Sequence, residues 1–517
     1  AVTETDYKAL DLYRIAFEHY VADEEKSPDS KTEYRIASML LDGKGVEPDL
    51  EKAIDYFKQS AEKGHQYAQY TLGKIYLSDE YGVYDFSAAV SYFEQSAEQG
   101  NQYAQYTLGK IYLSNEYGVE DVDMAIMYLT QSAEQDNQFA QYTLGVIYSD
   151  EEFEGADRDL AKEYFTKSAE QGNEYAQYKL GKLLIDEVAA DGSYGFNFGL
   201  GLEWIKKSVE QKNQYAQYAL GKIYLSDEYG VKNIDKAIKY LEQSAEQNNQ
   251  FAQYTLGVIY SNDEFEKADE NLAEEYFTKS AEQGNQFAQY RLGKMLIDKV
   301  TTFNSYGFYL GLGLNWLKQS AEQNNQYAQY ELGRIYLSDE FGVKNINMSI
   351  TYFKQAAEQD NQYAQYALGK IYLSDEYGVK DINTAISYLN QSAAQNNEFA
   401  QYRLGKLYYF GNDFIPPDKE LGMHYLKLSA EQGNEYAKNT INNIVNRNNA
   451  EFLYPAKLML SELARAMALM AVNSFHQHNN EENRHKNDKP RFVADSHQKA
   501  AGHYQSQSQS PNNYMPR

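Results

Sequence analysis

The nine residues Asn101-Gln-Tyr-Ala-Gln-Tyr-Thr-Leu-Gly109 decide the fold of this chain, because they recur almost unchanged ten times. The steps between successive copies are 36 residues, except for two steps of 40. A fixed period in this range is typical of a solenoid built from two-helix units. A degenerate copy at 33–37 precedes the others, so we expect eleven units. The ten clear copies end at Gly73, Gly109, Gly145, Gly181, Gly221, Gly257, Gly293, Gly333, Gly369 and Gly405.

Each unit is expected to begin with an amphipathic helix that starts just after an asparagine. The Asn101 side chain can accept a hydrogen bond from an unpaired backbone N–H and so cap the helix. Ala104, Leu108 and Ile111 follow at helical spacing and form one apolar face. Gly109 costs about 1 kcal/mol of helix propensity relative to alanine. A glycine that recurs at this place predicts a close approach of two helix backbones.

A second helix is expected at 124–133, and its packing face consists of Ala125, Leu129, Ser132 and Ala133. Gly118 ends the loop between the two helices, where it is free to take a positive φ. The unit then closes, and the next asparagine begins another. The sequence therefore predicts an all-α protein.

The two 40-residue steps carry longer segments, 191–201 and 303–313, which are rich in glycine and aromatic residues and which we expect to be loops. Each is followed by a tryptophan, Trp204 or Trp316, and these are the only two in the chain. They lie 112 residues apart, which is the length of three units. The array is therefore expected to contain tandem copies of a three-unit block, 109–220 and 221–332.

The array is expected to cover 31–446, preceded by a capping helix and loop at 1–30. An amphipathic helix is predicted at 451–473, and its apolar stripe over 456–470 is a candidate for capping the array or for self-association. The segment 474–517 is polar, rich in histidine and glutamine and nearly without aliphatic residues, so we expect it to be disordered.

Composition excludes several classes of function. The net charge of −27 opposes direct binding of nucleic acid by the array and favours basic or neutral partners. The chain has no cysteine and no run of 18 apolar residues that would span a membrane. We find no catalytic triad, phosphate loop or metalloprotease motif. We therefore expect no enzyme activity, no catalytic residues, no cofactor and no metal site, and we expect a cytoplasmic protein.

A basic residue follows the unit glycine in eight of the ten copies, and stacked units would align these residues in a row. One interpretation is a groove for an acidic peptide or an extended anion. The other is pairing with acidic side chains of the same or adjacent helices. The basic residues are Lys74, Lys110, Lys182, Lys222, Lys294, Arg334, Lys370 and Lys406.

A glutamine lies four residues before the glycine in all ten copies, for example Gln105 and Gln217. These side chains are candidates for hydrogen bonds to a bound peptide backbone or for bridges between neighbouring units. Trp204 and Trp316 are candidate partner contacts, because tryptophan is frequent at binding hot spots, with core packing as the alternative. Most of the 50 tyrosines are expected to be packing residues.

The pattern Asn-x-Tyr-Ala-Gln-Tyr-x-Leu-Gly-x-x-Tyr, then Gly-Val, then an Ala-Ile-x-Tyr helix ending Ser-Ala-Glu-Gln, closely resembles the SEL-one-like repeat family, a relative of the tetratricopeptide repeat. The resemblance covers about 31–446. It implies a right-handed α-solenoid that acts mainly as a scaffold for protein partners. Some exported members are cysteine-rich with a disulfide in each unit, and this chain departs from that pattern.

A narrower resemblance is to the repeat arrays that follow the relaxase domain in mobilisation proteins of Gram-positive conjugative elements. It rests on the entry segment 9–45 and on the uniform Gln-Tyr-Ala-Gln-Tyr copies. It implies a catalytic relaxase domain upstream of Ala1.

The sequence thus predicts an all-α, right-handed superhelix of eleven units that binds protein or peptide partners on its concave helix layer. The alternative function is the accessory arm of a conjugative relaxase.

Overall fold

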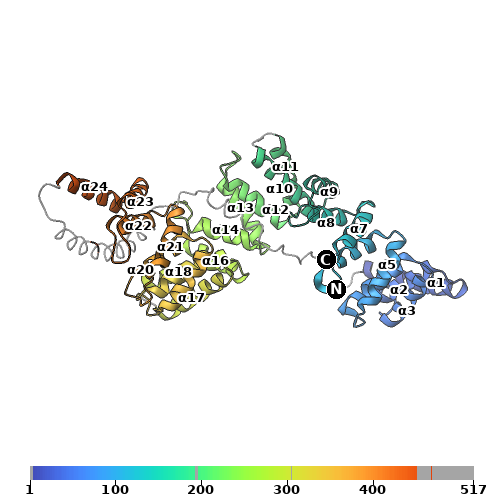
Figure 1. Cartoon of the computed structure of the whole chain (residues 1–517). Coiled ribbons are helices and arrows are strands. Elements are labelled where there is room, and N and C mark those ends of the chain that lie inside the picture. Colours follow the sequence, from blue (N-terminus) through green and yellow to red (C-terminus); the bar gives the residue numbers. More distant parts are fainter. Residues whose placement is uncertain (1–3, 192–195, 304–305, 451–466, 468–517) are drawn as a thin grey trace. The chain divides into compact units, whose positions relative to one another are not determined.

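The computed structural model describes residues 4–191, 196–303, 306–450 and 467, and every regular element in this part of the chain is a helix (Figure 1). Two short 3-10 turns, η1 (Asp79–Tyr81) and η2 (Asn115–Tyr117), lie in loops. The α-helices are α1 (Glu4–Lys26), α2 (Ser30–Asp42), α3 (Leu50–Glu62), α4 (Gln66–Leu77), α5 (Phe86–Glu98), α6 (Gln102–Tyr112), α7 (Val122–Ala133), α8 (Gln138–Tyr148), α9 (Arg158–Glu170), α10 (Glu174–Asp191), α11 (Phe196–Glu210), α12 (Gln214–Leu225), α13 (Ile234–Glu246), α14 (Gln250–Tyr260), α15 (Glu270–Glu282), α16 (Gln286–Phe303), α17 (Tyr306–Glu322), α18 (Gln326–Leu337), α19 (Ile346–Glu358), α20 (Gln362–Leu373), α21 (Ile382–Ala394), α22 (Glu398–Phe410), α23 (Lys419–Glu431) and α24 (Glu435–Ala450).

From α2 to α23 the helices form eleven consecutive pairs, which confirms the predicted number of two-helix units. We call the two members of a pair its first helix and its second helix. Within the compact parts of the chain, a second helix packs against its own first helix and against the first helix of the next unit. Each unit therefore buries its apolar surface only with its neighbours' help, as expected of a solenoid.

The chain divides into two compact units, residues 1–223 and 224–517, with the boundary inside α12. In the first, α1 lies at the N-terminal end and packs against α2, which is the place expected for a capping helix. In the second, α24 packs against α23. The predicted helix at 451–473, with its stripe at 456–470, and the polar tail at 474–517 fall on 451–466 and 468–517, outside the described residues.

The repeated asparagine caps its helix as predicted. The Asn101 side chain accepts hydrogen bonds from the backbone N–H groups of Tyr103, at 3.0 Å, and Ala104, at 3.3 Å. In the one copy that has histidine instead, His65 Nδ1 accepts from the N–H of Ala68 at 3.2 Å. The expected apolar face is also confirmed, because Ala104 and Leu108 are fully buried.

The unit glycine makes room for a side chain in the ordinary units. A Cβ added to Gly109 would lie 2.5 Å from Leu129 Cγ, and one added to Gly73 would lie 2.6 Å from the Phe93 ring. The predicted contact between two backbones occurs in a 40-residue unit, where a Cβ on Gly181 would lie 2.7 Å from the carbonyl oxygen of Gly201. The glycine therefore fits the second helix closely in both cases, through different atoms.

The prediction of long loops at 191–201 and 303–313 was wrong for most of each segment. Helix α10 continues to Asp191, and α11 begins at Phe196, while α16 continues to Phe303 and α17 begins at Tyr306. Gly201 and Gly313 lie inside second helices. The backbone carbonyl of each of these two glycines approaches the unit glycine of the paired first helix. These glycines serve helix packing, so they were misleading as signals of a loop.

Candidate partner-binding face

Most first helices carry a partly exposed aromatic side chain at their second position, and these side chains form a row; α2, which has Lys31 there, is an exception. We call this set the aromatic row. Its rings rest against tyrosines of the preceding unit, with Tyr70 and Tyr103 centroids 6.2 Å apart and Tyr330 and Tyr363 centroids 6.0 Å apart. The members that are 36–50% exposed are Tyr67, Tyr103, Phe139, Tyr215, Phe251, Phe287, Tyr327 and Tyr363. Exposed rings that recur along consecutive units give a candidate interaction surface.

The tyrosines that support this row are more deeply placed. Burial raises the pKa of Tyr106, and it raises the pKa of Tyr142 to about 12. Burial is also the main cause that raises the pKa of Tyr70 and Tyr402. These phenols therefore stay neutral at physiological pH. Their hydroxyls are used within the array, for example that of Tyr70, which is hydrogen-bonded to Thr107 of the next unit.

The predicted basic row lies on the same face of the first helices, since its members follow the aromatic row by seven residues, about two helical turns. The ammonium groups of four of them lie 5.3–6.0 Å from the ring centroids of the tyrosines four residues earlier, for example Lys110 above Tyr106. The four are Lys74, Lys110, Lys370 and Lys406.

Pairing with acids, the other interpretation of this row, is seen at Arg334, whose guanidinium lies 3.1 Å from the Glu331 carboxylate. Lys182 and Lys294 are half-buried, and Lys222 is exposed. The structure thus places the eight basic residues on equivalent positions of the first helices, next to the aromatic row. Their role as partner contacts stays a prediction.

The glutamine ladder lies inside the array. Gln105 is 4% exposed, and its amide nitrogen donates to the Ala97 carbonyl of the preceding unit at 3.2 Å. Its side-chain oxygen accepts a hydrogen bond from Gln135 at 2.7 Å. Gln217 is equally buried. This geometry is the one expected of bridges between units, and it leaves these two side chains little surface for a partner.

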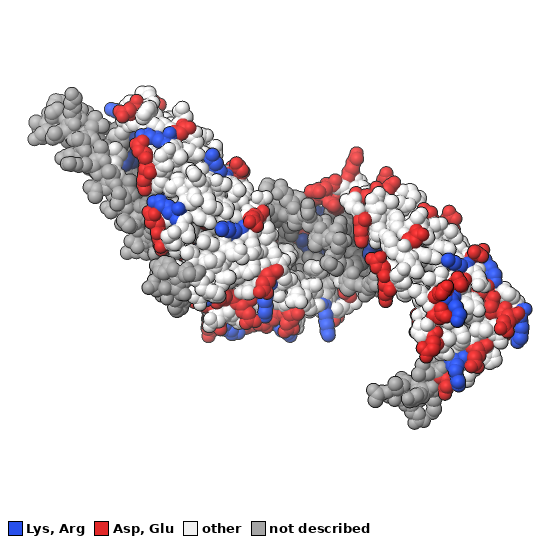
Figure 2. Space-filling model, turned by 90° about the horizontal axis from the view of Figure 1, so that it is seen from below, with Lys and Arg blue, Asp and Glu red and all other residues white. Residues whose placement is uncertain are grey.

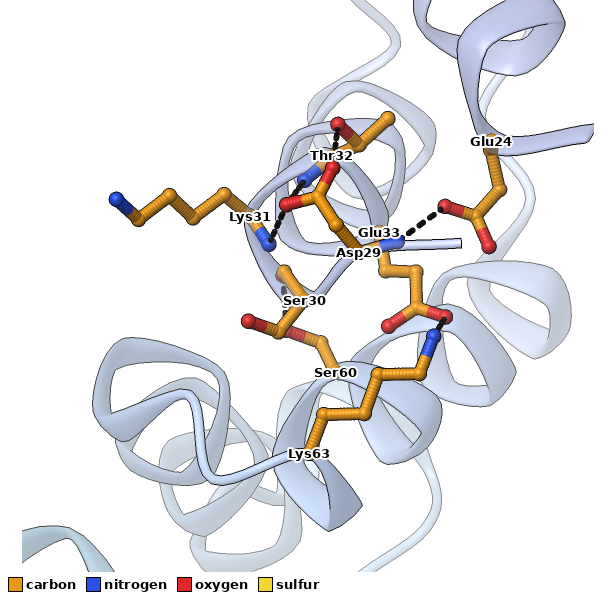
Figure 3. Close-up of polar contacts among 8 residues, drawn as sticks. All are labelled: Glu24, Asp29, Ser30, Lys31, Thr32, Glu33, Ser60 and Lys63. Carbon is orange, nitrogen blue, oxygen red and sulfur yellow. Dashed lines mark hydrogen bonds and ion pairs between the residues drawn. The ribbon is translucent and has the colours of Figure 1, made fainter. Parts of the chain in front are cut away.

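The first unit replaces this glutamine bridge by an ion pair. Glu33 lies 36 residues before Gln69, and Lys63 lies 36 residues before Gln99, which donates to Gln69. Figure 3 shows the Lys63 ammonium on one oxygen of the Glu33 carboxylate, with Glu24 of α1 on the opposite side. Burial raises the pKa of Glu24, and the neighbouring Glu33 acts in the same direction. At the N-terminal end of the glutamine ladder, a charged Glu33–Lys63 pair thus replaces the neutral pair of glutamines.

A row of buried serines occupies the packing face of the second helices, as expected for Ser132, but the hydrogen bond that each serine makes was not predicted. Ser132 Oγ donates to the carbonyl of Gln102, the first residue of its own first helix, at 2.7 Å. Ser168 and Ser280 make the same bond to Gln138 and Gln250 at 2.7 Å. The serine of the Ser-Ala-Glu-Gln ending, which only Ala356 replaces, was the signal. Its function is structural, because it ties the two helices of one unit together.

The tryptophans lie apart from the aromatic and basic rows, on the second helices α11 and α17, and both are half-buried. Trp204 packs against the core that contains Phe165 and Leu180, and the Lys207 ammonium lies 3.9 Å from its ring. It occupies the position that Tyr164 holds in the preceding unit. The structure therefore does not bring the tryptophans together with the basic row of the first helices.

The distribution of charged side chains over the surface and the length of the apolar helices bear on which other ligands the protein can bind. On the face drawn in Figure 2, acidic side chains are interspersed with basic ones and with wide uncharged areas. Among the described residues, no group of His, Asp or Glu side chains is arranged to hold a metal ion. None of the described helices is long and apolar enough to cross a membrane. Although the net charge is acidic, this face therefore also carries uncharged areas and basic side chains that a partner can contact.

Comparison with known proteins matches the chain to the family model of the Sel1 repeat. A crystal structure of a protective antigen present in uropathogenic Escherichia coli strains, displaying an SLR fold, is 27% identical with a TM-score of 0.61, and covers 86% of this chain and 93% of that chain. A Sel1 repeat protein from Oxalobacter formigenes is 24% identical with a TM-score of 0.40, and covers 69% of this chain and 91% of that chain. A search of curated proteins gave no match. The family model matches 30–65, 66–101, 102–137, 138–173, 214–249, 250–285, 310–325, 326–361, 362–397 and 399–434.

Proposed function

Because this chain belongs to the Sel1-repeat family, we propose that it is a non-catalytic scaffold that binds protein or peptide partners along the exposed face of its first helices. We expect this face to be the concave layer of the solenoid. The aromatic row is the observation that carries the proposal. Its half-exposed rings are supported by buried tyrosines, so a partner would meet apolar surface that is already ordered and would lose little side-chain entropy on binding.

The surroundings of the aromatic row support a peptide ligand. Lysines beside the rings, such as Lys74 and Lys110, supply charged donors, and each is held over a tyrosine at 5.9 or 6.0 Å. Apolar anchors with a few polar groups between them are typical of protein interfaces. The repetition of one pattern in consecutive units favours an extended partner, which can use several units at once.

No observation favours the accessory arm of a relaxase, so we do not propose that function. We keep the cytoplasm as the predicted compartment.

The proposal is tested by selecting binders from a random-peptide library on the intact protein. The selected peptides are then measured against Tyr67→Ser/Tyr103→Ser and a control, Tyr84→Ser/Met127→Ser. The four side chains are 41–50% exposed, but only the first two belong to the aromatic row. We expect the first variant to lose at least about tenfold in affinity, or 1.4 kcal/mol, and the control to bind normally. Failure to select any peptide, or loss only in the control, would refute the proposal.

A further inference from the structure

Three cations gather on one face of two neighbouring first helices near the end of the array. Lys370 lies on α20, and Arg403 and Lys406 lie on α22. Arg403 and Lys406 are three residues apart and therefore share a helix face. The Tyr366 ring beneath Lys370 lies 6.0 Å from the Phe399 ring of α22, centroid to centroid, so the faces of α20 and α22 that carry these cations adjoin. We call these three residues the basic cluster.

The lysines of the basic cluster are poorly hydrated. The Lys370 ammonium lies 5.5 Å from the Tyr366 ring centroid, and the Lys406 ammonium lies 5.3 Å from that of Tyr402. All three cations are half-buried. Burial, with a further contribution from Arg403, lowers the pKa of Lys370 and of Lys406 to about 8, while Glu376 partly offsets the effect on Lys370. Mutual repulsion in a partly desolvated site is relieved when an anion binds.

The same basic pair recurs at three-unit intervals, as Lys179/Lys182 and Arg291/Lys294, each 112 residues before the next. In both earlier copies a carboxylate lies close by. Burial raises the pKa of Asp186, and Lys182 on the same helix opposes that shift. Glu331, which binds Arg334 in the unit after the second copy, acts together with Arg291 on the Tyr290 hydroxyl.

The basic cluster has neither acid at the equivalent positions. Asn443 stands where Glu331 stands one block earlier, and Phe410 stands where Asp186 stands two blocks earlier. Lys370 also adds a cation at a position that valine holds in both earlier copies, Val146 and Val258.

We propose that the basic cluster binds an acidic segment of a protein partner, with side-chain carboxylates of that segment placed between Lys370, Arg403 and Lys406. The proposal rests on the proposed function, and it specifies the partner's chemistry at one place on the first-helix face. The Arg403 guanidinium can bind a carboxylate through two parallel hydrogen bonds, and the lysines add point charges. The half-exposed Tyr363 of the aromatic row lies on the same face of α20, about two turns before Lys370, so an aromatic or aliphatic residue of the partner near the acids would have an apolar contact.

The test is fluorescence anisotropy with a labelled polyglutamate peptide and a polyglutamine peptide of the same length. At physiological ionic strength the Debye length is about 8 Å, so repulsion from the rest of the acidic chain is largely screened. The variant Arg403→Gln/Lys406→Gln is compared with Lys344→Gln/Lys380→Gln, which removes the same charge. Those control lysines pair with Asp339 and Asp375 in loops, at 2.7 and 2.8 Å.

We expect the wild-type protein to bind polyglutamate and not polyglutamine. We also expect the cluster variant to lose at least about tenfold in affinity, and the control to change less than about twofold. Equal losses in both variants would overturn the proposal, because they would show a general charge effect. Tighter binding of a DNA strand than of polyglutamate at the cluster would overturn it as well.

Two further outcomes separate this inference from the proposed function. If polyglutamate does not bind, while library peptides still bind the aromatic row, the basic cluster is discarded and the scaffold proposal stands. If neither kind of peptide binds, both proposals fail.

Discussion

At the scale of single residues, the unit glycine shows how one missing side chain sets the distance between two helices. Gly109 accepts the Leu129 side chain, and Gly145 accepts the Phe165 ring in the same way. The helix propensity lost at glycine is offset by the apolar side chain that the second helix buries there.

Gly109→Ala should therefore destabilise its unit, by about 1–3 kcal/mol, because the new Cβ overlaps Leu129 in a packed core. A helical glycine with free space provides the control. Gly199 in α11 has nothing within 4 Å of an added Cβ, so Gly199→Ala should stabilise by about 0.5–1 kcal/mol. Amide hydrogen exchange of α6 and α7, or of α10 and α11, measures both effects. Slower exchange in Gly109→Ala would contradict this account.

The lysines of the basic cluster predict a pH dependence of ligand binding. The pKa of Lys370 and of Lys406 is about 8, so both are mostly charged at pH 7 and mostly neutral above pH 9. Affinity for polyglutamate should therefore fall as the pH rises through about 8. Lys370→Arg/Lys406→Arg keeps its charge and should remove most of this dependence; an unchanged pH profile in that variant would refute the assignment.

At the scale of elements, neighbouring units are tied by buried side chains that bond to backbone carbonyls. Gln105 bridges two units, and Ser132 bridges the two helices of one unit. In the first unit the neutral bridge becomes the pair of Glu33 and Lys63. Within the described part of the chain, the second carboxylate oxygen of Glu33 is buried without a hydrogen-bond partner.

This ion pair predicts a non-additive response to mutation. Lys63→Ala should destabilise the first unit by about 2 kcal/mol, because it leaves the Glu33 carboxylate buried without its cation, and the value is reduced by the exposure of Lys63. Glu33→Gln/Lys63→Gln restores the pattern of the later units and should be neutral or stabilising. The readout is the free energy of opening of α2 and α3 by hydrogen exchange. A double variant less stable than Lys63→Ala would argue against this interpretation.

Most elements could be predicted from the sequence, because the same local signals recur in register many times. Asn101 predicted the start of a helix, and Leu108 predicted its buried face. Gly118 predicted a turn, and its φ is 66° in the structure. The loops expected at 191–201 and 303–313 failed, because glycine signals both a turn and a close helix contact. The partner of Gly201 lies 20 residues earlier in the sequence, so only the folded unit distinguishes the two cases.

The candidate site was predicted in part. The positions of the basic row could be predicted from the repeat period. The tyrosine rings beneath the lysines were not predicted, because in an acidic chain carboxylates were the expected partners of the lysines. The aromatic row was hidden among 50 tyrosines. Its members differ from packing tyrosines in exposure, a property that depends on how consecutive units stack.

At the scale of the whole molecule, the array contains tandem three-unit blocks, and its stability should be a sum of local terms. Deletion of 221–332 joins Leu220 to Gly333 in register, so units away from the junction should keep their protection from hydrogen exchange. Deletion of 221–326 removes a similar length out of register and should unfold the units at the junction. General loss of protection in the first deletion would contradict the view of independent neighbours.

The central claim is that partners bind the first-helix face, and site-specific photo-crosslinking tests it most directly. A benzophenone amino acid replaces either Tyr103 on α6 or Met127 on α7, which are 49% and 41% exposed in the same unit. Each protein is irradiated with a peptide selected on the wild-type array. Our account predicts a crosslink from position 103 and none from position 127. A crosslink from 127 alone would show that partners bind the second helices and would contradict it.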